Sequence, residues 1–238
     1  MQHVLGVIPA RGGSKGIPEK NLAPLAGKPL LSYTCAAALG SRRLTRVVLS
    51  TDDARIAQAG RMQGVDVPFV RPAELSRDDT PMLPVLQHAV RCHEEERGSH
   101  VDAVVLLQPT SPLRRPEHID AAVDLLEQTG ADSVVTVVEV PHQFNPVSLQ
   151  RIEQGRLVPF TPGVNMTRRQ DKPPVYARNG PAVVAVRRSV LFDKNSLYGE
   201  DTRPIVMSPQ ESIDIDGPWD LELVEFLLER RATGTRRL

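Results

Sequence analysis

Three cations and three glycines lie close together in the segment 11–21, whose sequence is Arg-Gly-Gly-Ser-Lys-Gly-Ile-Pro-Glu-Lys-Asn. Glycines let backbone N–H groups approach a phosphate, and Arg11, Lys15 and Lys20 would neutralise its charge. Neither the Walker A pattern nor the GxGxxG dinucleotide fingerprint is present. We therefore interpret the segment as a polyphosphate-binding loop. The alternative is a surface loop with ordinary solvated cations.

A second polar segment, 108–114, follows the apolar run at 103–107. It carries Gln108, Thr110 and Ser111, whose neutral hydrogen-bonding groups suit a sugar or the edge of a base. Prolines at 109 and 112 stiffen the turn and lower the entropy cost of ordering it. The alternative is a plain strand-to-helix connection in which Thr110 or Ser111 is a local cap.

Two carboxylates, Asp214 and Asp216, alternate with isoleucines in the segment 212–216. On a strand, alternate side chains point to the same face, so the two carboxylates would lie side by side. Their mutual repulsion is relieved by a hard divalent cation, and Mg²⁺ is usually held by one or two carboxylates together with substrate phosphates. We therefore predict a Mg²⁺ site at this pair. The alternative is an exposed acidic edge strand.

Other polar residues suggest less. In the acidic turn at 50–53, Thr51 or Asp52 is expected to cap a helix that begins near Ala54. The six histidines show no metal-ligand spacing, and no Ser-His-Asp or Cys-His nucleophile is visible. Cys35 and Cys92 form neither a disulfide framework nor a zinc pattern, so we expect two free thiols, with Cys35 in the core.

Short apolar runs alternate with helical patterns over the first 138 residues, which is typical of parallel strands covered on both faces. The sequence therefore predicts a doubly wound α/β sheet. The expected strands are 4–8, 46–50, 67–70, 103–107 and 133–138, and the expected helices are 30–39, 54–62, 84–96 and 116–129. Since ligands of such sheets bind at the carboxyl ends of strands, the loops at 11–21 and 108–114 should open near each other.

The pattern changes after residue 140. Seven prolines between positions 141 and 181, without a long amphipathic helix, predict an excursion of loops or short strands away from the sheet. An apolar strand at 182–186, short strands at 205–207 and 213–215, and a helix at 218–231 are expected beyond it.

The 238 residues carry 29 Lys and Arg against 29 Asp and Glu, so the net charge gives no global reason to expect nucleic acid or an anionic membrane as partner. The charge is nevertheless segregated. Segment 1–21 has three cations and one acid, 165–188 has six cations and one acid, and 211–225 has six acids and no cation. This distribution fits a metal–triphosphate site with an anionic acceptor. No signal or membrane segment is apparent, and we expect a cytoplasmic protein.

Taken together, these segments resemble the acylneuraminate cytidylyltransferases, or CMP-sialic acid synthetases. The matching stretches, in the family's order, are 8–21, 50–52, 71–75, 106–114, 179–180 and 212–216. The resemblance implies a Rossmann-like nucleotidyltransferase fold, with helices on both faces of a mostly parallel sheet. It also implies a homodimer, in which a dimerisation insert at 141–175 reaches over the neighbouring subunit's site from a nucleotidyltransferase domain formed by 1–140 and 176–238.

The resemblance further implies roles for individual residues. Those expected to hold the triphosphate and act in catalysis are Arg11, Lys15 and Lys20. Those expected to bind the rest of the nucleotide are Ala10, Gly12, Gly13, Asn21 and Arg71. Those expected on the sugar side are Gln108, Thr110, Ser111, Arg178 and Asn179, and the expected Mg²⁺ ligands are Asp214 and Asp216.

The implied reaction joins CTP to a 2-keto-3-deoxy sugar acid, giving a CMP-sugar and pyrophosphate. Family members commonly have Arg-x-Asn-Gly-Ala-Ile-Tyr, whereas here Arg178 stands next to Asn179 and a valine replaces the tyrosine. The change lies on the acceptor side, so an octulosonate or a phosphonate stays open as the acceptor. A non-catalytic nucleotide-binding protein and a P-loop kinase are the alternatives outside this class.

Overall fold

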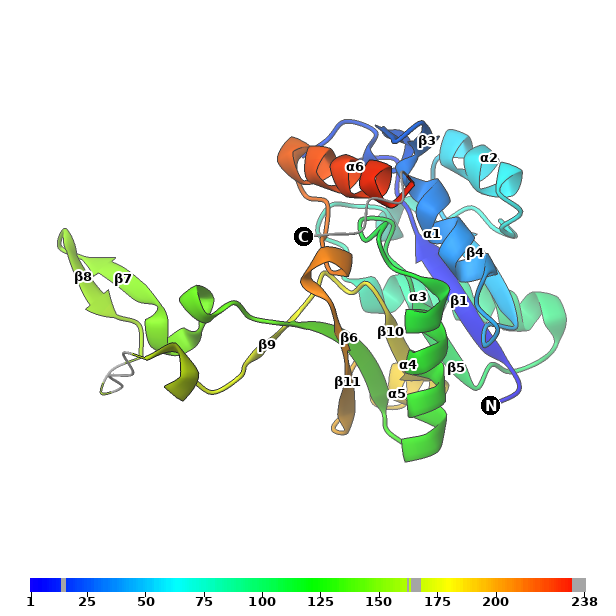
Figure 1. The fold of residues 1–238 in the computed structure, drawn as a ribbon. Helices are drawn as coiled ribbons and strands as arrows, with labels where there is room; N and C mark the ends of the chain where they lie inside the picture. Colours follow the sequence, from blue (N-terminus) through cyan, green and yellow to red (C-terminus); the bar gives the residue numbers. More distant parts are fainter. Residues whose placement is uncertain (14–15, 162, 164–167, 233–238) are drawn as a thin grey trace.

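A computed structural model describes residues 1–13, 16–161, 163 and 168–232 (Figure 1). The central strands are β1 Val4–Pro9, β4 Arg46–Ser50, β5 Ala103–Leu106, β6 Ser133–Glu139, β9 Tyr176–Arg178, β10 Val184–Arg187 and β11 Thr202–Met207. The helices are α1 Leu30–Leu39, α2 Ala54–Met62, α3 Met82–Arg97, α4 Pro116–Thr129, α5 Arg188–Phe192 and α6 Pro218–Ala232. Two small hairpins pair β2 Pro24–Leu25 with β3 Lys28–Pro29, and β7 Gln150–Glu153 with β8 Arg156–Pro159.

The strands of the central sheet lie in the order β11-β6-β10-β5-β1-β4. β1 is parallel to β4 and β5, and β11 is parallel to β6, whereas β10 runs antiparallel to both of its neighbours. The fold is thus a mainly parallel α/β sheet, which confirms the fold class predicted from the sequence.

Both faces of the sheet are covered by helices, and this explains why the central strands are apolar along their whole length. On one face, Val4 and Ile8 of β1 pack with residues of α1 and α4, such as Leu31 and Ile119. On the other face, Leu5 and Val7 pack with residues of α3 and α5 (Figure 1). A third apolar cluster, which includes Leu25, Ile215 and Val224, seats α6 against the β2–β3 hairpin.

The antiparallel partner of β6 is interrupted in the middle. β10 pairs with Ser133–Val135 and β9 pairs with Val137–Glu139, so both lie along β6. At the break, the Thr136 N–H donates to the Val183 carbonyl at 3.0 Å, and the Val183 N–H donates to Thr136 Oγ1 at 3.0 Å. Residues 179–182 therefore leave the ladder at a fixed point, beside the carboxyl ends of the parallel strands.

Between β6 and β9 the chain forms an arm, residues 140–175, that projects away from the sheet and carries the β7–β8 hairpin (Figure 1). All four residues of β7 are exposed, and so are large apolar side chains: Phe144, Ile152, Leu157 and Phe160. The division into domains and the dimerisation role of this segment stay predictions.

Two expected strands are wrong. Residues 67–70 do not pair with the sheet, although an isolated bridge joins Val48 to the preceding Asp66. Pro68 has no N–H to donate to a ladder, and the chain then turns across the surface with Val70 exposed. Residues 213–215 are also not a strand. They cross the ends of the sheet, where the Ile215 N–H donates instead to the Thr110 carbonyl at 2.8 Å.

Candidate active site

A cavity of about 190 Å³ opens at the carboxyl ends of β1, β4 and β5. Its wall brings together seven of the residues predicted for the site: Arg11, Gly13, Lys20, Asn21, Arg71, Gln108 and Thr110. The remaining lining residues are Pro9, Met82 and Pro109, of which the sequence pointed only to Pro109, as a residue that stiffens the turn. The expected meeting of the two loops is therefore present in the structure.

Hydrogen bonds hold the described part of the glycine-rich loop against its neighbours. The Gly12 N–H donates to Asp52 Oδ1 at 3.0 Å, Asn21 Nδ2 donates to the Arg11 carbonyl at 3.0 Å, and Arg11 pairs with Asp78. Lys15 lies outside the described residues. The predicted helix cap was wrong, because Asp53 accepts from the Arg55 and Ile56 N–H groups. Asp52 is thereby left to bind the loop, a role that its place after a strand did not reveal.

Arg71 forms a buried wall of the cavity. Its Nε and Nη2 atoms have no hydrogen-bond partner, and the nearest carboxylate oxygen, Asp52 Oδ1, is 3.8 Å from Nη2. Burial and the nearby Arg11 lower the pKa of Arg71, while Asp52 partly offsets them. Unused donors on a buried guanidinium are costly, so this wall is suited to a ligand that supplies acceptors.

Lys20 connects the phosphate loop to the acidic segment. Its Nζ donates to the Ile215 carbonyl at 2.7 Å and lies 3.8 Å from Asp216 Oδ1. The loop backbone also touches this segment, because a Cβ on Gly16 would come within 2.4 Å of the Asp216 carbonyl oxygen. Only glycine fits there, so the polyphosphate loop and the two aspartates form one continuous rim.

The two aspartates are not equivalent, contrary to the expectation that they share one strand face. Asp214 turns inward against Thr110 and Gly180, where a Cβ on Gly180 would lie 2.2 Å from Asp214 Oδ2. Asp216 points outward, with its side chain 85% exposed. The physical reason is that the segment is a loop held by the Ile215–Thr110 bond, so strand alternation does not apply.

Burial raises the pKa of Asp214 to about 6, with a further contribution from Asp216 and against a hydrogen bond from Thr110. Asp214 Oδ1 is buried without a hydrogen-bond partner. A buried carboxylate oxygen with no donor is suited to a hard cation, so the pair fits Mg²⁺. No group of three or more His, Cys, Asp and Glu side chains gathers within the described ranges, so a cation here would complete its shell with substrate phosphates and water.

The predicted sugar-side residues lie in three places: lining the cavity, buried behind it and, for Arg178, away from it. Gln108 and Thr110 line the cavity. Ser111 and Asn179 are buried behind it: Ser111 Oγ donates to the Gly180 carbonyl at 3.4 Å, and Asn179 Nδ2 donates to Ser212 Oγ at 3.0 Å. Asn179 Oδ1 has no partner. Ala10, expected on the nucleotide side, is also buried, and its N–H donates to the Ser50 carbonyl at 2.9 Å.

The structure does not bring Arg178 to this cavity. As the last residue of β9 it pairs with Val137 on the sheet, and its guanidinium lies over the Tyr198 ring at 4.7 Å. It lines a separate, mostly apolar cavity of about 520 Å³ that includes Tyr176 and Val206. The break in the strand explains the separation, because Asn179 turns inward at the point where Arg178 is still part of the ladder.

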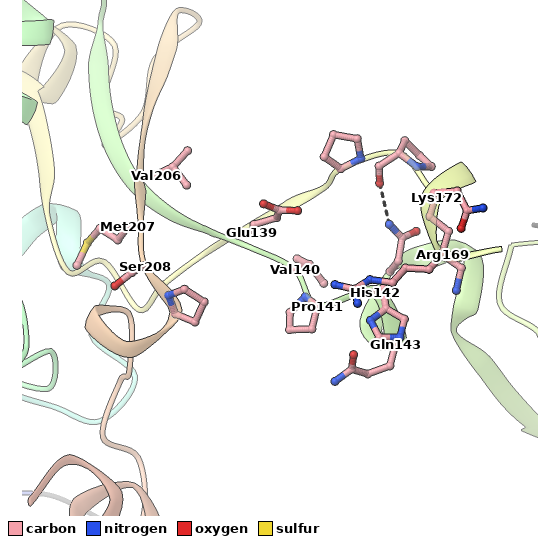
Figure 2. A pocket seen from close by; sticks show the side chains of 15 residues that line it. Glu139, Val140, Pro141, His142, Gln143, Arg169, Lys172, Val206, Met207 and Ser208 are labelled. Carbon is pink, nitrogen blue, oxygen red and sulfur yellow. Dashed lines mark hydrogen bonds between the residues drawn. The ribbon is translucent and has the colours of Figure 1, made fainter. Parts of the chain in front are cut away.

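A larger cavity, of about 1000 Å³, separates the base of the arm from the ends of β6 and β11. Figure 2 shows Met207 and Ser208 on the sheet side and His142, Arg169 and Lys172 on the arm side. The sequence pointed to this region through its excess of prolines and of cations, but did not predict a cavity there.

Comparison with known proteins shows the family of this chain. The family described as Cytidylyltransferase matches residues 5–228. A CMP-N,N'-diacetyllegionaminic acid synthase of Legionella pneumophila is 38% identical over 95% of this chain and 96% of its own. N-acylneuraminate cytidylyltransferase A of Danio rerio is 34% identical over 94% of this chain, which spans 50% of that protein.

Among solved structures, the fold is similar to that of CMP:2-keto-3-deoxy-manno-octonic acid synthetase complexed with CTP, with a TM-score of 0.72 and 20% identity over 96% of this chain and 99% of that one. The fold is that of a nucleotidyltransferase. The chain belongs to the cytidylyltransferase family. Within the described residues, none of the helices is both long and apolar enough to span a bilayer.

Proposed function

We propose that this protein transfers the CMP group of CTP to a sialic-acid-like nonulosonate, a 2-keto-3-deoxy sugar acid, and releases pyrophosphate. The observation that carries the proposal is the continuous rim: Arg11, Lys20 and Arg71 line one cavity, and Lys20 joins it to the acidic segment, with Nζ 2.7 Å from the Ile215 carbonyl and 3.8 Å from Asp216 Oδ1. The names of relatives at 34–38% identity, which include a diacetyllegionaminic acid synthase, support a nine-carbon acid as acceptor.

The reaction needs positioning and charge neutralisation more than covalent help. The anomeric hydroxyl oxygen forms a bond to the α-phosphorus in line, the bond from that phosphorus to the bridging oxygen of pyrophosphate breaks, and the hydroxyl proton passes to solvent water. Arg11, Lys15 and Lys20 hold the triphosphate and stabilise the leaving pyrophosphate. Gly12, Gly13 and Asn21 fix the loop against it.

Asp214 and Asp216 are the residues that would hold Mg²⁺. When bound, the ion supplies charge neutralisation at the α-phosphate. Asp214 is in contact with Thr110 and Gly180, so it joins the loop after β5 to the segment that carries Asn179. Gln108 and Asn179 are the groups that we assign to the sugar.

A homodimer is the second part of the proposal. It is supported by the apolar side chains that the arm exposes, Ile152, Leu157 and Phe160 among them, since contiguous exposed apolar surface marks interaction sites. In a dimer, Arg178 and the cations of the arm, which lie far from the nucleotide cavity of their own chain, could contact the cavity of the partner chain. The free thiols Cys35 and Cys92 support a cytoplasmic location.

The test is release of pyrophosphate with CTP and Mg²⁺ across three acceptors: N-acetylneuraminate, N,N'-diacetyllegionaminate and 2-keto-3-deoxy-octonate. We expect release that requires both CTP and a nine-carbon acid, with ATP and UTP as nucleotide controls. Preference for the octonate would change the acceptor but keep the class. Failure to release pyrophosphate with any acid, or formation of a nucleoside diphosphate instead, would contradict the proposal.

A further inference from the structure

Arg114 is a buried cation that the reaction scheme above does not use. Its side chain is 3% exposed, at the end of the loop that carries Gln108, Thr110 and Ser111. Nη1 donates to the Gln108 carbonyl at 3.0 Å and to the Ala182 carbonyl at 2.8 Å, and Nη2 donates to Thr34 Oγ1 at 2.5 Å. No ion pair joins it to a carboxylate within the part of the chain that the structure describes.

This arrangement is expensive to fold. Removing a guanidinium from water costs several kcal/mol unless a carboxylate or a full set of hydrogen bonds compensates it. Here Nε has no partner, and burial lowers the pKa of Arg114 to about 9. An apolar side chain of similar length would fill the same space at less cost, so packing alone does not account for a charge at this position.

The hydrogen bonds show what the guanidinium connects. The Gln108 carbonyl belongs to the loop after β5, and the Ala182 carbonyl belongs to the segment 179–182 that breaks the β9–β10 strand. A second bond, from Ser111 Oγ to the Gly180 carbonyl at 3.4 Å, joins the same two segments. Thr34 Oγ1 also reaches the Gln108 carbonyl at 3.4 Å, which fixes that residue from α1.

We infer that Arg114 is a positioning residue for the acidic acceptor: its planar fork holds the Gln108 carbonyl and the Ala182 carbonyl at a fixed separation, and thereby sets the separation between Gln108 and Asn179. The inference rests on the proposed function. The triphosphate side has its own connections, through Asp52, Lys20 and Ile215, and none of these bonds includes Arg114. Loss of Arg114 should therefore affect the acceptor far more than CTP.

The experiment compares Arg114→Met and Arg114→Lys in steady-state kinetics with CTP and the preferred sugar acid. For Arg114→Met we expect the acceptor KM to rise by about tenfold or more and kcat to fall, while the dissociation constant of CTP–Mg²⁺ changes by less than about threefold. Arg114→Lys keeps the charge but cannot form the fork, so its acceptor KM should lie between those of the wild type and Arg114→Met. Arg42→Met, at an arginine whose side chain is 87% exposed, is the matched control and should leave both constants unchanged.

Thr34→Val separates positioning from folding, because it removes the bond to Arg114 Nη2 and the long bond of 3.4 Å to the Gln108 carbonyl, but leaves both bonds from Arg114 Nη1 to the carbonyls in place. It should lower the melting temperature without raising the acceptor KM. The inference would be overturned, and the proposed function left intact, by one result. In that result Arg114→Met and Arg114→Lys weaken CTP and acceptor binding equally, and the loss of affinity follows the loss of melting temperature in all variants. A wild-type protein that released no pyrophosphate and bound no sugar acid would overturn the proposed function and this inference together.

Discussion

The carboxylates at the amino ends and at the carboxyl ends of the parallel strands lie in opposite environments. At the amino ends of the parallel strands, Glu94 pairs with Arg188 at 2.7 Å and accepts from the Val101 N–H at 3.0 Å. Burial would raise the pKa of Glu94, but Arg188, the Val101 N–H and His100 lower it to about 2. Asp132, just before β6, pairs with Lys194 at 2.8 Å, and its pKa is also lowered to about 2 by Lys194 and backbone donors.

At the carboxyl ends of the parallel strands, by contrast, buried polar atoms are left without hydrogen-bond partners. The pKa of Asp214 is raised, and buried polar atoms of Asp214, Asn179 and Arg71 have no partner. Buried groups without partners cost stability, and proteins retain them where function needs them. We infer from this difference that the carboxylates at the amino ends stabilise the fold, whereas those at the carboxyl ends are kept for ligands. The four predictions below test this division, from the largest expected effect to the smallest.

Asp214→Asn should reduce turnover by about a hundredfold or more, because it removes a charge that we propose to hold Mg²⁺ for the transferring phosphate. The same change should stabilise the free protein at pH 8. The pKa of about 6 lies above the value of 3.8 expected in the unfolded chain, so the cost of ionising the buried carboxylate is absent below about pH 4 and complete above pH 6. The gain should be about 1–3 kcal/mol at pH 8 and smaller at pH 5, measured by denaturant unfolding.

Asp216→Asn is the matched control, because this side chain is exposed. It should lose turnover to a similar degree without gaining stability. A less stable Asp214→Asn at pH 8, or near-normal turnover in either variant, would contradict the division between the two edges.

Lys20→Met should lower kcat/KM for CTP by about a hundredfold, since Lys20 supplies a cation to the triphosphate and connects the loop to Ile215. The measurement is initial rate against CTP concentration. Lys28→Met, at an exposed lysine of the β2–β3 hairpin, should behave like the wild type. Equal effects in the two variants would show that any nearby cation suffices.

Ile152→Asp should convert the proposed dimer to a monomer and reduce turnover by about tenfold, because it places a charge on an apolar side chain that is 76% exposed on the arm. Sedimentation velocity gives the oligomeric state, and thermal unfolding checks that the fold persists. Gln154→Asp adds the same charge at the hairpin turn and should remain dimeric. A wild-type protein that sediments as a monomer would refute the dimer and leave the nucleotide cavity as proposed.

Glu94→Gln should destabilise the fold by about 1–2 kcal/mol at pH 7 and leave turnover unchanged. Because the folded-state pKa is depressed, the contribution of Glu94 is complete above about pH 4.5 and is lost as the pH falls toward 2. The unfolding free energies of the variant and the wild type should therefore converge in acid. Parallel curves down to pH 3 would show that the ion pair with Arg188 contributes little.

Much of the fold followed from local pattern. The continuous apolar runs marked β1, β4, β5 and β6 because both faces of the sheet are covered. The meeting of Arg11 with Gln108 followed from strand direction alone, since both loops leave the same edge. These features depend on short stretches of sequence and on a general rule of parallel sheets.

The rest depended on contacts between segments far apart in the chain. The inward turn of Asp214 is set by a backbone bond to Thr110, which strand alternation in the segment 212–216 could not reveal. The separation of Arg178 from Asn179 arises where the strand beside β6 breaks. Arg114 attracted no attention in the sequence, because nothing local shows that an arginine after Pro112-Leu113 will be buried.

The way the arm joins the sheet has a consequence for its length. The chain leaves and returns through neighbouring residues: Glu139 is paired with Tyr176, and the Val140 N–H donates to the Val175 carbonyl at 2.9 Å. Insertions or deletions in the arm beyond these paired residues should not shift the register of β6, and doubling the length of the enclosed loop costs only about 0.6 kcal/mol of closure entropy. A change in the length of the arm should therefore leave the rim of the proposed active site in place.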